Sequence, residues 1–243
     1  MKTIATFFFI FCAMATYGQK HFEEDEFNTP QGKLKITFIG HGTLMLDFNG
    51  TVIHVDPWTN LADYTKLPKA DLILVTHEHG DHLDAKAIEE LTKQGTELVY
   101  TAKCKQSKPA LKGMVMKNGE KTTFHTIGIE AVPAYNMVNK RPDGTPFHPR
   151  GDGNGYILTL GGMRVYIAGD TENTPEMKAL KHIDIAFLPM NLPYTMTPEM
   201  VADAAMAFKP KVLYPYHYGE TDVTKLTDLL KNSGIEVRIR NMK

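Results

Sequence analysis

Cysteine, excess charge of one sign and long apolar runs are all scarce in this 243-residue sequence. The 27 basic and 28 acidic side chains leave a formal net charge of -1, so the chain has no global basic field to concentrate nucleic acid. The most apolar segment, Ile4 to Ala15, is shorter than the ~20 residues that a membrane-spanning helix needs. We therefore expect no nucleic-acid partner and no stable membrane anchor.

The N-terminal segment instead has the pattern of a secretory signal peptide. Lys2 precedes the apolar stretch, and small and polar residues up to Gln19 follow it. We predict cleavage after residues 1–19 and export of residues 20–243 to the periplasm or the medium, with an uncleaved anchor as the alternative. Cleavage removes Cys12 and leaves Cys104 alone, so core packing or metal, and not an internal disulfide, must stabilise the mature protein.

Strand patterns alternate with helix patterns along the mature chain. Three strands joined by glycine turns predict an antiparallel meander at 33–39, 43–48 and 51–56. The pattern then changes to strand, helix and strand at 71–76, 84–94 and 97–101, which indicates an α/β fold. Further strands are predicted at 121–126, 127–132, 155–160, 163–169, 183–188, 211–216 and 235–239, and further helices from Thr174, from Thr197 and around 223–230. Nothing in this order suggests a second domain.

One long segment, 136–154, has no periodicity and is rich in proline, glycine and cations. Loops of this length in compact domains are usually functional lids or disordered, and we favour a lid. Its cations Lys140, Arg141 and Arg150 either form a solvated face or converge on a site, in which case they imply an anionic small-molecule substrate.

The stretch VTHEHGDHLD, residues 75–84, carries three histidines and three acids directly after the apolar run DLILV. The helical zinc-protease pattern needs a second histidine four residues after His77, and that position is Asp81. The residues therefore suit a loop at a strand end. Imidazole and carboxylate are good ligands for zinc, manganese or iron, so this loop predicts a metal site rather than a chance surface cluster.

The motif His77-x-His79-x-Asp81-His82 resembles the signature of the metallo-β-lactamase-fold hydrolases, whose four-layer αββα sandwich carries one or two metals at its edge. Three further stretches resemble that family: Asp56 at the end of a strand, Asp170 in AGDT, and His217 in YHY. The early GHGTLML, which contains His41, resembles the branch of ascorbate-6-phosphate lactonase and N-acyl-phosphatidylethanolamine phospholipase D.

The resemblance implies two divalent ions, most simply zinc, with manganese or iron possible. It assigns His77 and His79 to one metal, Asp170 to a bridge, and Asp81, His82 and His217 to the other metal. Because two cations ~3.5–4 Å apart repel each other, an anionic bridge and a shared hydroxide stabilise the pair and supply the nucleophile. The resemblance thus makes Asp81 and Asp170 the catalytic carboxylates and leaves Asp56 to orient a ligand histidine.

The first metal lacks the third histidine that the family provides, because Asn136 occupies the matching position. We predict that His148 folds back to complete this site, since Pro146 and Pro149 limit its backbone freedom and the arrangement would carry Arg150 toward the substrate. The alternatives are that only one metal binds tightly, or that His148 belongs to a rigid surface loop.

The remaining histidines have simpler interpretations. His41, between two glycines, either faces the metals or serves a turn, and we keep it as a candidate for supporting the metals or the substrate. His54, His125 and His182 are expected to be structural or surface residues.

Three functions remain open. The first is a metal-dependent hydrolase that cleaves an ester, lactone, amide or phosphodiester bond with a metal-bound hydroxide. The second is an iron-dependent redox enzyme of the same fold, although the diiron flavoproteins have glutamate at the position of His79. The third is a non-catalytic metal-binding protein, which the apparent loss of a ligand at Asn136 would suggest. The oligomeric state is not predicted.

Overall fold

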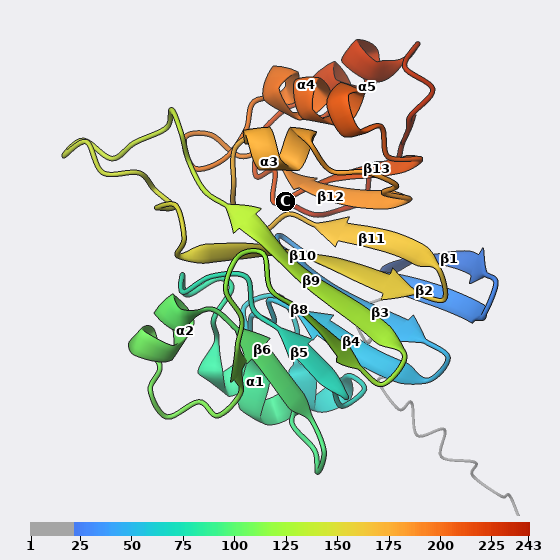
Figure 1. Cartoon of the computed structure of the whole chain (residues 1–243), viewed down its shortest axis with the longest axis vertical. Coiled ribbons are helices and arrows are strands. Elements are labelled where there is room, and N and C mark those ends of the chain that lie inside the picture. Colours follow the sequence, from blue (N-terminus) through green and yellow to red (C-terminus); the bar gives the residue numbers. More distant parts are fainter. Residues whose placement is uncertain (1–21) are drawn as a thin grey trace, which may run out of the picture.

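The computed structural model describes residues 22–243, so the predicted signal peptide, residues 1–19, lies outside the described part. Two seven-stranded sheets stack face to face, with helices on the outer face of each (Figure 1). The predicted αββα sandwich is therefore confirmed. None of the helices in residues 22–243 is long and apolar enough to cross a membrane.

The first sheet has the strand order β1-β2-β3-β4-β5-β6-β7. Neighbours are antiparallel from β1 to β4, as predicted for the meander, and parallel from β4 to β7. Its strands are β1 Glu23–Thr29, β2 Gly32–Gly40, β3 Thr43–Phe48, β4 Thr51–Val55, β5 Leu72–Leu74, β6 Glu97–Tyr100 and β7 Met114–Val115.

The second sheet repeats this plan, because it is antiparallel from β8 to β11 and parallel from β11 to β14. Its strands are β8 Lys121–Phe124, β9 Ile127–Ala134, β10 Gly153–Leu160, β11 Met163–Ile167, β12 Ile185–Pro189, β13 Val212–Tyr216 and β14 Glu236–Val237.

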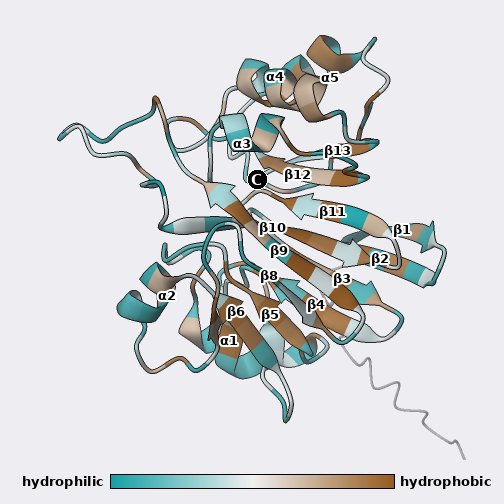
Figure 2. Cartoon of the chain, viewed as in Figure 1, coloured by the Kyte–Doolittle hydropathy of each residue, from teal (hydrophilic) through white to brown (hydrophobic). Residues whose placement is uncertain are grey.

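Alternation along the strands separates two apolar cores. In β5, Leu72 and Leu74 belong to the core between the sheets, whereas Ile73 and the following Val75 face the helices of the first half. Successive side chains of a strand point to opposite faces, so a strand covered on both sides must be apolar throughout. Figure 2 shows this apolar colouring along the central strands, whereas the outer helices carry both hydrophilic and hydrophobic segments.

Thr174 and Thr197 cap α3 and α4 as predicted, each accepting a hydrogen bond from the backbone of the first turn. The predicted helix at 84–94 is shorter than expected and ends at Leu91, because Thr92 leaves the helical conformation and Gly95 adopts a positive φ. The helices are η1 Tyr64–Lys66, α1 Ala85–Leu91, α2 Ala102–Ser107, α3 Pro175–Lys178, α4 Pro198–Phe208 and α5 Thr224–Leu230.

The strand β1 has no apolar pattern that would predict it, since its sequence is EEDEFNT. Besides its pairing with β2, ion pairs with the C-terminal segment hold it: Arg240 donates two hydrogen bonds to Asp25, and Arg238 also contacts that carboxylate. Two distant ends of the described chain are thereby joined at one edge of the sandwich.

Strand direction brings the candidate residues together. The β2, β4 and β5 strands run the same way in the first sheet, and β9, β11 and β13 do so in the second. The residues after their carboxyl ends therefore meet at one edge of each sheet. The backbone NH of His217, after β13, donates to the carbonyl of His41, after β2, and so links the two edges at 2.9 Å.

Candidate metal centre

The HEHGDH segment forms a loop between β5 and α1, as the sequence predicted. The backbone NH groups of His82 and Leu83 both donate to the carbonyl of His79, which closes a tight turn. Asp84 then caps α1 by accepting hydrogen bonds from the first turn. This turn directs the histidines before and after it toward the same edge of the sandwich.

A first group of potential ligands consists of His77, His79 and His148, whose ring nitrogens lie within 4.8 Å of one another. His77 Nε2 is 3.1 Å from His79 Nδ1. The His148 ring meets both of these rings at centroid distances of 5.0 and 4.9 Å. The structure thus brings His148, and not the side chain of Asn136, to the other two histidines.

A second group consists of His41, Asp81, His82 and His217. His41 Nε2 is 3.1 Å from Asp81 Oδ2, and its ring lies 3.7 Å from that of His217. The sequence left His41 between a turn and a metal-facing position. The structure places its side chain among the potential ligands, which gives this group one more nitrogen than we predicted.

Asp170 lies between the two groups. One carboxylate oxygen is 3.8 Å from His77 Nε2 and 3.3 Å from His148 Nε2, on the first side. The carboxylate also lies 3.6 Å from His82 Nε2 and 3.4 Å from His217 Nε2, on the second side. A carboxylate in this position can contact an ion in either group.

The unpaired atoms fit divalent cations. His82 Nε2, His148 Nε2, His217 Nε2 and Asp170 Oδ1 are buried and have no hydrogen-bond partner within residues 22–243. Leaving a buried polar atom unpaired costs about 1–3 kcal/mol, so four that converge on one place require a ligand. Imidazole nitrogens with a carboxylate are a donor set that zinc, manganese and iron accept.

Neighbouring side chains fix which nitrogen of each ring faces the centre. Asp56 accepts from His82 Nδ1 at 2.8 Å, and Asn136 Oδ1 accepts from His148 Nδ1 at 2.7 Å. Because these contacts keep a proton on Nδ1, Nε2 is the nitrogen that faces the centre and is available to a metal once it is deprotonated. Thr76, whose hydroxyl donates to Asp56, can accept from His77 Nδ1 and orient that ring in the same way.

The charges within the centre also suit metal binding. Burial and the neighbouring His82 hold the pKa of His77 well below its usual value, so this ring is neutral. Burial raises the pKa of Asp170, but His217 and His82 outweigh it and keep the carboxylate ionised. Burial lowers the pKa of His82, but Asp170 and Asp56 outweigh it and raise the pKa to about 10. A metal at His82 must therefore displace a proton.

Asn136 supports His148 rather than replacing it. Its Oδ1 accepts from both the backbone NH and Nδ1 of His148, and its own backbone NH donates to the His148 carbonyl. Arg150, in contrast, does not reach the centre as we predicted. Glu176 in α3 pairs with its guanidinium, and the side chain lies over the ring of Tyr135 at the surface.

Sequence reasoning missed Glu172, which anchors the predicted lid. This carboxylate is fully buried and accepts hydrogen bonds from the Asn136 side chain and from the backbone NH groups of Met137, Val138 and Asn139. The contacts form a chain from Glu172 through Asn136 to His148. Only its place two residues after Asp170 could have drawn attention to it.

Replacing Glu172 with glutamine should lower the free energy of unfolding by about 2–4 kcal/mol, because an amide nitrogen would face backbone donors in a buried site. Urea unfolding measures this. The matched control is Glu176→Gln, whose carboxylate is partly exposed and should change stability by less than about 1 kcal/mol. Equal effects of the two variants would show that Glu172 does not anchor the loop.

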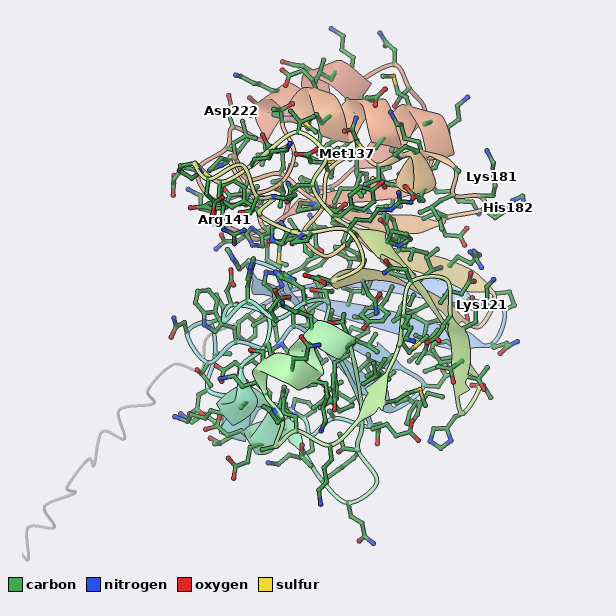
Figure 3. All side chains as sticks on the ribbon, turned by 60° about the vertical axis from the view of Figure 1, so that its left-hand side comes forward. Lys121, Met137, Arg141, Lys181, His182 and Asp222 are labelled. Atoms are coloured by element: carbon green, nitrogen blue, oxygen red, sulfur yellow. The ribbon has the colours of Figure 1, made fainter. Side chains whose placement is uncertain are left out.

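Three further histidines of the described residues, His54, His125 and His182, lie outside the two ligand groups. His125 and His182 are exposed at turns with positive φ, and Figure 3 shows His182 on the side of the molecule opposite Arg141. His54 is fully buried, with Nε2 3.0 Å from the Pro68 carbonyl. Burial lowers its pKa to about 4, although the Pro68 contact raises it.

His54 should make stability fall with acid. Its folded pKa of about 4 is below the usual 6.5, so the unfolded chain binds the proton first as the pH drops. Between about pH 7 and pH 5, this costs about 2 kcal/mol, and the loss levels off near the folded pKa. Metal-free His54→Gln should lack this part of the pH dependence in urea unfolding, and His182→Gln should keep it. A slope equal to that of the parent protein in His54→Gln would contradict the assignment.

Backbone geometry also marks the centre. His41, Asp56 and His217 all have φ values near +50°, a backbone conformation that is unfavourable for residues other than glycine. Gly42 has no room for a side chain, since an added Cβ would lie 2.8 Å from the His82 ring. The turn after β2 therefore needs glycine at this position if His82 is to keep its orientation.

The centre opens into a cavity of about 600 Å³. Potential ligands form its floor, and the loop between β9 and β10 together with the segment after β12 forms its wall. The lining residues are His41, His79, Gly80, Asp81, Arg141, Phe147, His148, Asp170, Asn191, Tyr194 and His217.

Comparison with known proteins agrees with this fold. The family model "Beta-lactamase superfamily domain" matches residues 35–217, which include every potential ligand. A UPF0173 metal-dependent hydrolase of Thermus thermophilus is 33% identical over 193 residues, covering 76% of this chain and 84% of the relative. One from Lysinibacillus sphaericus is 31% identical over 225 residues, covering 84% and 96%.

A crystal structure assigned as a metal-dependent hydrolase of Parabacteroides distasonis is 54% identical, with a TM-score of 0.87, and the match covers 92% of this chain and all of that one. The chain thus belongs to the beta-lactamase superfamily and, within it, to the UPF0173 metal-dependent hydrolase family.

Proposed function

We propose that this protein hydrolyses an ester, lactone, amide or phosphodiester bond with the help of two divalent metal ions, most simply zinc. The convergence of unpaired ring nitrogens from two histidine groups on the Asp170 carboxylate carries this proposal. The names of the relatives, metal-dependent hydrolases, support it.

His77, His79 and His148 would hold one ion, and His41, Asp81, His82 and His217 the other, with Asp170 in contact with both. Such a pair would supply a Lewis acid for the scissile bond and would lower the pKa of a bound water toward neutral pH. The chain contributes the orientation. Asp56 and Asn136 hold the rings of His82 and His148, which orients Nε2 of each ring toward the centre before any ion or substrate arrives.

Rigid strands position several of the potential metal ligands. Asp170 and His217 directly follow strands of the second sheet, and His77 follows one of the first, so their positions depend on the packed cores. A strand end restricts side-chain position more closely than a long loop does, and precise placement is what accelerates a bimolecular reaction. Only His148 depends on the loop between β9 and β10.

The alternative function, a non-catalytic metal-binding protein that has lost a metal ligand, rested on the presence of Asn136 at the ligand position. His148 supplies the nitrogen that Asn136 cannot, and this favours catalysis. The likeness of GHGTLML to the branch of ascorbate-6-phosphate lactonase and N-acyl-phosphatidylethanolamine phospholipase D remains a proposal. So does export to the periplasm or the medium, which rests on residues 1–19.

The proposal is tested by loading the metal-free protein with zinc, manganese or iron and screening lactones, phosphodiesters and amides. Hydrolysis that depends on metal and disappears in Asp170→Asn supports it. If the protein binds metal but turns over none of these bonds, or consumes oxygen with iron, then the hydrolase assignment fails.

A further inference from the structure

The wall of the cavity carries aromatic and cationic side chains that metal binding at its floor does not require. Phe147 and Tyr194 meet edge to face, with ring centroids 5.1 Å apart, and both line the cavity. Two loops carry them, the one between β9 and β10 and the one after β12. The side chains of Asn136 and Asn139 tie these loops together by donating to the carbonyls of Tyr194 and Thr195.

The same two loops expose apolar side chains. Eight large hydrophobic residues are exposed among residues 22–243, and half of them lie here: Met137, Val138, Leu192 and Tyr194. Val138 is 72% exposed. Tyr194 also lines the cavity, so the apolar character of these two loops extends to its wall.

Arg141 adds a positive charge to this wall. Its guanidinium lies over the Phe147 ring at 5.2 Å, and Nη1 donates to the carbonyls of Pro146 and Phe147. No carboxylate among the described residues lies within 4 Å of its guanidinium, and the nearby exposed Asp143, whose pKa Arg141 helps to lower, accepts its hydrogen bonds from Thr145 instead. Figure 3 shows Arg141 on the projecting loop.

Arg141 therefore differs from Arg150 on the same loop. Arg150 is neutralised by Glu176 and lies at the surface, whereas Arg141 lines the cavity with His79 and His148 and donates its hydrogen bonds to neutral carbonyls. A guanidinium that is held in place and keeps unpaired donors is suited to the two oxygens of a carboxylate or phosphate.

We propose that the substrate is an organic anion with an apolar or aromatic body, whose carboxylate or phosphate binds Arg141 and whose body packs on Phe147 and Tyr194. This inference rests on the proposed hydrolase function, because it places the scissile bond over the metal-binding floor. In the reaction, water adds a hydroxyl to the attacked carbon or phosphorus and a proton to the leaving group, so no further reactant is needed.

The test measures binding and does not require turnover. Trp58 is the only tryptophan in the sequence and its ring lies 5.4 Å from that of His41, so its fluorescence can report binding to the zinc-loaded protein. The probes are 4-phenylbutyrate, phenyl phosphate and the neutral 4-phenylbutanamide. At least one anion should bind ~10-fold more tightly than the amide, and the better of the two anions identifies the charged group.

The variants distinguish binding of the anion to the Arg141 guanidinium from its direct binding to the metal ions. Arg141→Gln should weaken binding of the preferred anion by ~10-fold or more, Arg141→Lys by less, and Arg150→Gln by less than about twofold. Tyr194→Ala should weaken the anion and the amide alike. Zinc content is measured first in each variant, so that a displaced His148 is recognised.

If Arg141→Gln with full zinc content leaves the anion's affinity within about twofold of the parent value, the anion binds the metals alone and the proposal is wrong. The proposal is equally wrong if the amide binds as tightly as both anions. Failure of the hydrolase function looks different, because the probes would then bind with the expected dependence on Arg141 while no bond is cleaved.

Discussion

Asp170→Asn should reduce metal-dependent hydrolysis by at least ~10²–10³-fold while the protein stays folded. Among residues 22–243, Asp170 is the one carboxylate within 4 Å of potential ligands from both groups, so its loss separates the two sites. Asparagine has nearly the same shape, and Asp170 follows a strand end, so the cores should not change. Steady-state kinetics with the metal ion in excess measures the loss of hydrolysis, and circular dichroism checks that the protein stays folded.

The matched control is Asp203→Asn, which also removes one negative charge but lies on the exposed face of α4, paired with Lys178. It should hydrolyse substrate at the parent rate. A folded Asp170→Asn protein that is as active as Asp203→Asn would exclude a carboxylate bridge between the two metals.

His148→Ala should lose one of two metal equivalents, because it removes a nitrogen that no neighbour can replace. Asn136→Ala should keep both equivalents but weaken the metal at His77, His79 and His148 by ~10–100-fold, since Asn136 orients the His148 ring without being a ligand itself. Metal analysis after dialysis gives the stoichiometry, and competition with a chelator gives the affinity.

His182→Ala is the control for loss of an imidazole, because His182 is exposed and far from the centre. The opposite result, with full occupancy in His148→Ala and a lost equivalent in Asn136→Ala, would make the asparagine the ligand. The sequence alone allowed both outcomes.

Most of the metal centre could be predicted because its residues follow strands. Asp56, His77, Asp170 and His217 each come directly after an apolar run, and parallel strands bring such residues to one edge. Strand patterns also predicted the α/β fold, and the resemblance to the metallo-β-lactamase-fold hydrolases predicted the sandwich. The strand patterns failed at β1, where ion pairs of Asp25 with the C-terminal segment replace apolar burial.

The loop between β9 and β10 was harder to predict. Its sequence suggested that His148 returns to the metals, but it gave no indication that Asn136 would fix the ring or that Glu172 would hold the base of the loop. Such contacts join residues more than ten positions apart and follow no periodic pattern. For the same reason the prediction that Arg150 reaches the substrate was wrong. Arg150 pairs with Glu176 of α3, and Arg141 lines the cavity instead.

Titration of the metal-free protein with zinc, followed by calorimetry and by metal analysis of the dialysed product, tests the two-metal centre most directly. The two ligand groups that share Asp170 predict two equivalents for the parent protein and one for His82→Ala, which removes a ligand from the second group only. At most one equivalent in the parent protein, unchanged in His82→Ala, would contradict the two-metal centre.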